Sequence, residues 1–182
     1  FFTFSLSILL AYFSNFLVLI SIVSYYFLFL AYTFYLKARA VIDAFVIAFG
    51  FLLRALAGCW ATSIEITPWF YMVIFSFALY LAFTKRYTEI KLAKSSKETL
   101  EDYEKIVEMG IAISGASTIA IYSIYSLTKK NLIYTVPFAF LGLLLHLRET
   151  AKGKEVHESL KEPDLAIAFL LFLLSIFLLL YF

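Results

Sequence analysis

The sequence predicts an all-α fold, a polytopic bundle of transmembrane helices, and three observations support this prediction. Of the 182 residues, 63% are hydrophobic and only 15% are charged, which is too apolar for a water-soluble globular domain. The 28 charges (15 basic and 13 acidic) are concentrated, with 11 between Lys85 and Lys105 and 9 between Arg148 and Asp164. The runs between them are long enough to cross a bilayer and lack the alternation typical of barrel strands.

Seven apolar segments are expected to be membrane-spanning helices, since each is a continuous apolar run bounded by polar or charged residues. In chain order they cover approximately residues 2–14, 16–36, 41–60, 69–84, 106–128, 132–147 and 164–182. The first segment is short and begins without a methionine or a basic flank, so it resembles a helix entered part-way along. We therefore expect residues 1–182 to be a single transmembrane domain that is N-terminally incomplete.

The basic residues predict how the helices are oriented in the membrane. The loops at 37–40, 85–105 and 148–163 hold twelve of the fifteen Lys and Arg residues, whereas the opposite loops hold only Lys129 and Lys130. Because cytoplasmic loops carry an excess of basic residues, we expect the three charged loops to be cytoplasmic. The protein is accordingly expected to be a multi-pass protein of the plasma membrane.

The charged segment 85–105 is expected to contain an amphipathic cytoplasmic helix. Within it Leu100, Tyr103 and Ile106 recur at helical spacing, and Glu101 and Lys105 are four residues apart, as in a helix with one apolar face. This helix could cover a site at the membrane surface, which makes Tyr103 a candidate substrate-binding residue.

Arg54 is the charged residue that the sequence places deepest in the membrane. It follows Asp43 by eleven residues, about three helical turns, so both lie on one helical face with Arg54 roughly 16 Å deeper. Intramembrane charges usually face a partner or a wet cavity, so Arg54 is a candidate substrate-binding residue. Asp43 and Lys37, at the cytoplasmic start of the same helix, are candidates for the same role. The alternatives are a structural ion pair for Arg54 and a membrane anchor for Lys37.

The segment Thr84–Glu89 combines two cations with a carboxylate where the 69–84 helix is expected to leave the membrane. Lys85 offers a phosphate a point charge and Arg86 a bidentate fork. Glu89, four and three residues further on, lies on their face and can orient them. These three residues are predicted to form a phosphate-binding catalytic site, with a basic helix end facing lipid headgroups as the alternative.

Metal ligands are sparse in this chain. The three aspartates, Asp43, Asp102 and Asp164, form no DxxD pair, although Mg²⁺ bound with a diphosphate favours one or two carboxylates. Within the chain, Glu89 and Asp43 are the candidates for a metal ligand. His146 and His157 have no cysteine companions, so no zinc site is expected.

Several short stretches follow one another between Tyr32 and Glu89. They are Tyr32–Lys37 (YTFYLK), Ile42–Asp43, Gly50–Gly58 (GFLLRALAG), Pro68–Phe70 and Lys85–Glu89 (KRYTE). Together they resemble the decaprenyl-phosphate phosphoribosyltransferases, a branch of the UbiA-type membrane prenyltransferase superfamily. Ordinary members of the superfamily carry a second aspartate-rich motif where this sequence has KRYTE, and the replacement indicates the phosphoribosyl branch.

The resemblance implies a transferase that moves a 5-phosphoribosyl group from phosphoribosyl diphosphate to a polyprenyl phosphate lipid and releases diphosphate. It also implies nine transmembrane helices, of which the seven expected here match helices three to nine. The family's first aspartate-rich motif, which binds Mg²⁺ and diphosphate, would then precede Phe1. This chain alone is accordingly expected to be inactive.

Two other functions remain open. A UbiA-type prenyltransferase with an aromatic or glycerol-phosphate acceptor would use the same bundle, and a non-catalytic membrane scaffold or transporter core would explain the missing aspartates. The formal charge of +2 is too small to indicate a nucleic-acid partner, and a homo-oligomer is compatible with the sequence. The absence of Gln and the low numbers of Asn, Cys and Met suggest a thermophilic source.

Overall fold

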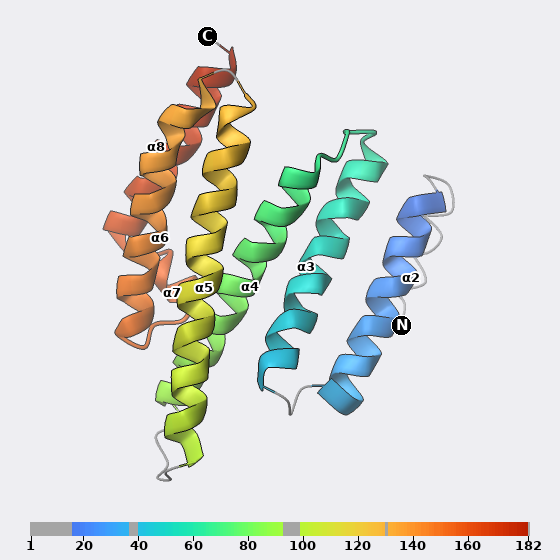
Figure 1. Ribbon diagram of the computed structural model, residues 1–182, viewed down its shortest axis with the longest axis vertical. Coiled ribbons are helices and arrows are strands. Elements are labelled where there is room, and N and C mark those ends of the chain that lie inside the picture. The colour runs from blue at the N-terminus through green and yellow to red at the C-terminus, as the bar shows by residue number, and fades with distance from the viewer. Residues whose placement is uncertain (1–15, 37–39, 93–98, 130, 182) are drawn as a thin grey trace. The chain divides into compact units, whose positions relative to one another are not determined.

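The computed structural model describes residues 16–36, 40–92, 99–129 and 131–181, and within these ranges it contains helices and no strand (Figure 1). The predicted all-α fold is therefore confirmed. The chain separates into two compact units, Phe1–Leu79 and Tyr80–Phe182, and the boundary falls inside helix α4. Each unit is described by itself below.

Five of the described helices are long and apolar enough to cross a membrane. They are Phe16–Tyr35, Val41–Ala61, Pro68–Leu92, Tyr103–Leu127 and Leu132–Ala151, and Pro163–Leu179 is a shorter apolar helix. These six correspond to the second to seventh predicted spans, while the first, at 2–14, lies outside the described residues. The chain is thus a multi-pass helical membrane protein by length and composition.

The first unit contains α2 (Phe16–Ala31), its π-helical continuation η1 (Tyr32–Leu36), α3 (Ala40–Ala61) and the start of α4 (Pro68–Leu92). Helices α2 and α3 lie side by side (Figure 1). Gly50 permits this approach, because a Cβ there would lie 3.3 Å from Cε2 of Tyr25. The rings of Phe45 and Phe49 pack on Phe75 of α4, with centroid distances of 5.9 and 5.1 Å.

Local sequence sets the start of α4. Thr67 is the N-cap, because its Oγ1 accepts the backbone N–H of Phe70 at 3.2 Å. Pro68 follows at the first helical position, where its missing N–H costs nothing. The helix then runs to Leu92, eight residues beyond the predicted end at residue 84. The apolar run ends at Thr84, but most of the charged residues that follow favour helix, so α4 continues through them.

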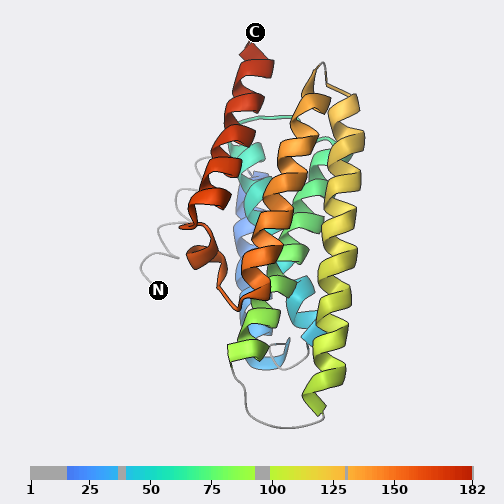
Figure 2. The ribbon, with the colours of Figure 1, turned by 90° about the vertical axis from the view of Figure 1, so that its left-hand side faces the viewer.

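The second unit contains the end of α4, then α5 (Thr99–Leu127), the 3₁₀ turn η2 (Leu132–Thr135), α6 (Val136–Ala151), α7 (Val156–Ser159) and α8 (Pro163–Tyr181). Helix α5 begins seven residues before the predicted start at 106, so the expected amphipathic segment is its first turns. Helix α6 lies between α5 and α8 (Figure 2). Tyr122 of α5 contacts both η2 and α8. Its hydroxyl lies 2.6 Å from Oγ1 of Thr135 in η2, and its ring packs on Phe172 of α8.

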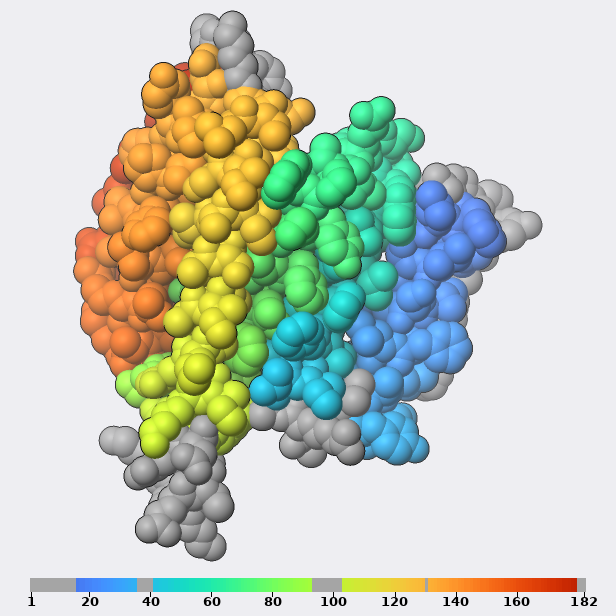
Figure 3. Space-filling model, viewed as in Figure 1, coloured from blue at the N-terminus to red at the C-terminus, as the bar shows by residue number. Residues whose placement is uncertain are grey.

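Helices α5 and α6 of the second unit expose many large apolar side chains, as expected of helices that span a membrane. On the face shown in Figure 3, α5 and α6 lie side by side. Both helices expose large apolar side chains, including Met109, Ile113, Phe140 and Leu144. The polar side chains Ser114 and Thr118 of α5 are buried instead, and each donates its hydroxyl to a backbone carbonyl of the preceding turn.

Two helical glycines provide a matched test of packing in the second unit. A Cβ at Gly110 of α5 would lie 2.7 Å from Cε1 of Phe83, whose side chain is buried, whereas no described atom lies within 4 Å of that position at Gly142 of α6. Gly110→Ala should therefore lower the free energy of unfolding by about 1–3 kcal/mol. Gly142→Ala should leave it unchanged or raise it by up to about 1 kcal/mol. Equal unfolding midpoints of the two variants in detergent would contradict this packing.

Candidate functional site

The candidate site is built on the part of α4 that continues past the apolar run. We call Lys85, Arg86 and Glu89 the basic cluster. Glu89 Oε1 lies 3.9 Å from Lys85 Nζ, and Arg86 Nη1 donates a hydrogen bond to Glu89 Oε2. The Lys85 side chain is 56% exposed, whereas that of Arg86 is only 14% exposed. One carboxylate therefore contacts both cations, and the cluster keeps a net charge of +1.

The opposite side of α4 packs into the second unit. Tyr80, Thr84 and Thr88, each one helical turn apart, are all 1% exposed. The Tyr80 hydroxyl lies 3.0 Å from Nδ1 of His146 on α6, and the tautomer of the ring decides which group donates. Arg86 and Glu89 lie roughly 140–160° around the helix from the middle of this buried row and Lys85 about 100°, so the basic cluster is on a different face of α4 from the row that contacts α6.

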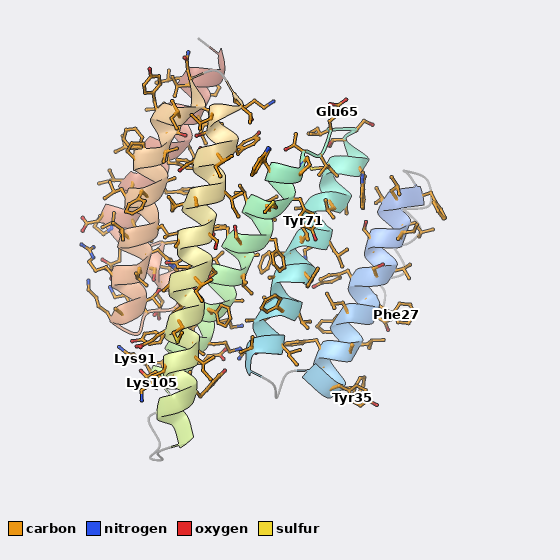
Figure 4. The ribbon with its side chains drawn as sticks, in the orientation of Figure 1. Phe27, Tyr35, Glu65, Tyr71, Lys91 and Lys105 are labelled. Atoms are coloured by element: carbon orange, nitrogen blue, oxygen red, sulfur yellow. The ribbon has the colours of Figure 1, made fainter. Side chains whose placement is uncertain are left out.

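Lys91 fixes the last turn of α4 to the end of α6. Its Nζ donates a hydrogen bond of 2.9 Å to the backbone carbonyl of Ala151. The same Nζ lies 4.8 Å from the ring centroid of Tyr87, one turn earlier on α4, a cation–π contact. Figure 4 labels Lys91 on α4 and Lys105 on α5, toward the same end of the second unit.

The C-terminal end of α6 carries a buried carboxylate. The Glu149 side chain is fully buried and contacts three cations: Arg148 Nε and Lys154 Nζ, each at 2.9 Å, and Lys152 Nζ at 2.7 Å. A buried charge is tolerated when several partners compensate it, as here. Glu149 thus links Arg148, Lys152 and Lys154 around the C-terminal end of α6.

Two further carboxylates complete this charged network. Arg148 Nη2 donates to Asp164 at 2.9 Å, and Lys154 Nζ donates to Glu162 at 2.5 Å. The hydrogen bond to Glu162, and next the one to Glu149, raise the pKa of Lys154. Three cations and three carboxylates balance in this network. In the basic cluster, Lys85 and Arg86 both contact the Glu89 carboxylate.

The remaining predicted site residues lie apart from the basic cluster in the sequence. Tyr103 is half-buried near the start of α5, in the second unit. Asp43 and Arg54 lie on α3, in the first unit, and the Asp43 side chain is 1% exposed. Lys37 lies outside the described residues. That these residues line one cavity with the basic cluster stays a prediction.

Arg54 has aromatic partners. Its Nη2 donates a hydrogen bond to the Tyr25 hydroxyl of α2. The guanidinium carbon lies 4.6 Å from the ring centroid of Tyr25 and 5.3 Å from that of Phe51. No carboxylate among the described residues pairs with Arg54, so the structure does not contain the ion pair weighed as the alternative. Tyr25 is not among the predicted site residues.

The described residues do not assemble a metal site. Nowhere in this part of the chain do three or more His, Cys, Asp or Glu side chains come together as metal ligands. Both Glu89 oxygens face cations of the basic cluster. The residues present therefore do not fit a Mg²⁺ ion on their own.

These features define a multi-pass helical membrane protein with a net positive cluster where a spanning helix continues past its apolar part. The predicted resemblance is confirmed by sequence comparison. The chain is 32% identical over 107 residues to the decaprenyl-phosphate phosphoribosyltransferase of Mycolicibacterium smegmatis, a match that covers 56% of this chain and 34% of that protein.

Two further relatives carry the same name. Over 78 residues, or 41% of this chain, the identity is 37% with the protein of Mycobacterium tuberculosis and 40% with that of Corynebacterium glutamicum. The matches cover 26% and 24% of those proteins. The chain thus corresponds to about a third or less of the length of these curated relatives. No protein-family model matches it.

Proposed function

We propose that this chain is part of a membrane glycosyltransferase that moves a 5-phosphoribosyl group from phosphoribosyl diphosphate to a polyprenyl phosphate. The similarity to proteins named decaprenyl-phosphate phosphoribosyltransferase supports the reaction. The observation that carries the proposal is the basic cluster, because two cations, Lys85 and Arg86, lie together toward the end of a membrane helix with one carboxylate that contacts both. Such a cluster suits a substrate that bears several phosphates.

The proposed chemistry needs charge stabilisation more than acid or base catalysis. The bond from ribose C1 to the diphosphate oxygen breaks, and diphosphate leaves with the electron pair. A bond from C1 to an oxygen of the lipid phosphate forms in its place. Lys85 and Arg86 hold donor phosphate oxygens and offset the charge that develops on the leaving group. Glu89 orients both cations and thereby pre-organises the site.

Four other residues belong to the same proposal as substrate-binding groups. Lys37, Asp43 and Tyr103 are proposed to bind substrate, and so is Arg54, which has guanidinium N–H groups beyond the one bonded to Tyr25. Mg²⁺ is proposed from the family resemblance alone. When bound, it would neutralise diphosphate charge. No step is assigned to it here, because the described residues do not form its site.

The proposed orientation puts the basic cluster at the cytoplasmic face of the plasma membrane. In a Cys59→Ser background, single cysteines at residues 104 and 161 should react with an impermeant maleimide from the cytoplasmic side. A cysteine at residue 129 should react from the opposite side. Labelling is measured in right-side-out and inverted vesicles. If residues 104 and 161 react from opposite sides, the proposed topology is wrong.

A comparison of two donors tests the proposed function. The intact protein that contains this chain is placed in lipid vesicles that hold polyprenyl phosphate together with an aromatic and a glycerol-phosphate acceptor, and it is given either labelled phosphoribosyl diphosphate or labelled prenyl diphosphate. We expect label in the lipid fraction from phosphoribosyl diphosphate. Transfer from prenyl diphosphate to an aromatic or glycerol-phosphate acceptor would support the prenyltransferase alternative and contradict the proposal. Transfer from neither donor would favour a non-catalytic membrane scaffold.

A further inference from the structure

The basic cluster lies between two points at which α4 is fixed to α6. Tyr80 contacts His146 and the carbonyl of Leu143 before the cluster, at 3.0 and 3.3 Å. Lys91 contacts the carbonyl of Ala151 after it, at 2.9 Å. The first anchor is inside the apolar run, where packing already holds the helix. The second is in the last turn of α4, where a helix end would otherwise fray.

Lys91 completes the C-terminal cap of α6. Gly153 has a left-handed φ of +84°, and its N–H binds the carbonyl of Thr150 at 2.9 Å, while the N–H of Lys154 binds that of Glu149 at 3.2 Å. This is the Schellman arrangement. The carbonyl of Ala151 lies in the same last turn, where helix carbonyls lack intrahelical partners, and it receives the Lys91 ammonium. A cation is also favoured there by the helix dipole.

The network around Glu149 stabilises the group that Lys91 binds. Glu149 and Lys152 flank the segment that contains Ala151, and their side chains pair at 2.7 Å. Lys154, just past Gly153, pairs with Glu149 as well. The acceptor of the Lys91 hydrogen bond therefore sits on an ordered helix end, so Lys91 ties α4 to a fixed point.

We propose that Lys91 is a positioning residue for the basic cluster, an inference that rests on the proposed function of that cluster. Lys91 and the buried row of α4 lie on one side of the helix, and Lys85, Arg86 and Glu89 lie on the other. Lys91 therefore fixes α4 to α6 on the side away from the basic cluster, and it does not contact the phosphates itself. Loss of this anchor displaces the cluster, and displacements of about 1 Å weaken a pre-organised site by up to about a hundredfold.

Three variants test this inference. Lys91→Met removes the donor but keeps an unbranched chain over Tyr87. Lys91→Arg keeps a cation that can reach Ala151. Lys161→Met is the matched control, since Lys161 is exposed and has no ion pair among the described residues. The probe is inorganic diphosphate, whose binding to the intact protein is measured by calorimetry. Hydrogen exchange reports the amides of residues 85–92.

For Lys91→Met we expect diphosphate to bind at least about tenfold more weakly and the amides of residues 85–92 to exchange faster. Lys91→Arg and Lys161→Met should behave like the unmodified protein. In the transfer assay, Lys91→Met should raise the KM for the donor more than it changes kcat. Unchanged diphosphate affinity in Lys91→Met, or no diphosphate binding by the unmodified protein, would overturn the inference. Diphosphate binding without transfer from phosphoribosyl diphosphate would overturn the proposed function instead.

Discussion

Arg86→Ala in the intact protein should weaken binding of the phosphoribosyl donor by about 2–3 kcal/mol, the range of a lost charge-assisted hydrogen bond. The side chain of Arg86 is 14% exposed and is held by Glu89, so its fork is already oriented before a phosphate binds. The variant also lowers the net charge of the basic cluster from +1 to zero. Binding of polyprenyl phosphate should change far less.

Titration of the donor and of the lipid against the purified protein measures both effects. Lys161→Ala, a substitution of an exposed cation outside the cluster, serves as the control and should leave both affinities unchanged. If Arg86→Ala binds the donor as tightly as the unmodified protein does, these residues are a basic helix end that faces lipid headgroups.

Arg54→Leu should abolish turnover and leave the stability of the protein nearly unchanged. A buried ion pair that loses its cation costs roughly 3–5 kcal/mol, but no carboxylate among the described residues pairs with Arg54. Its partners are the Tyr25 hydroxyl and two aromatic rings. Leucine keeps apolar contact with those rings, so the expected cost is about 1 kcal/mol for the hydrogen bond.

Denaturant unfolding and the transfer assay are measured on the same preparation. Tyr25→Phe is the matched control, because it removes the hydroxyl that accepts from Arg54 and keeps both the ring and the charge. It should share the small stability loss of Arg54→Leu but retain turnover. An Arg54→Leu protein that unfolds much more easily and yet turns over when folded would show that Arg54 is structural.

The positions of the helices could be predicted because each depends on one continuous apolar run. Their ends could not, since apolar character marks where a chain leaves the membrane and not where a helix stops. Four of the eight residues 85–92 are charged, yet Lys, Arg, Glu and Leu all favour helix, and α4 continues through them to Leu92. The same reason explains the early start of α5 at Thr99.

The contacts inside the basic cluster could be predicted because they are local. Glu89 is three and four residues from its cations, and that spacing alone brings them together. The partner of Arg54 could not be predicted in this way. Tyr25 precedes it by 29 residues, and among 13 tyrosines and 21 phenylalanines nothing in the sequence marks this one.

The support behind the cluster also depends on contacts between distant residues. Lys91 binds a backbone carbonyl 60 residues away, and a backbone acceptor leaves no trace in the sequence. In the sequence Glu149 is one of nine charged residues between Arg148 and Asp164. Only the packing of α6 shows that its carboxylate is buried. The sequence presents His146 only as a possible metal ligand, whereas in the structure it contacts the hydroxyl of Tyr80.

The position of a phosphorus label in the donor tests the proposed transfer most directly. The intact protein, in vesicles with polyprenyl phosphate, is given phosphoribosyl diphosphate labelled either in the 5-phosphate or in the terminal phosphate of the diphosphate. The proposed reaction moves the 5-phosphate label into the lipid fraction and leaves the diphosphate label in water. Diphosphate label in the lipid, or no lipid label from either donor, would contradict transfer of a 5-phosphoribosyl group.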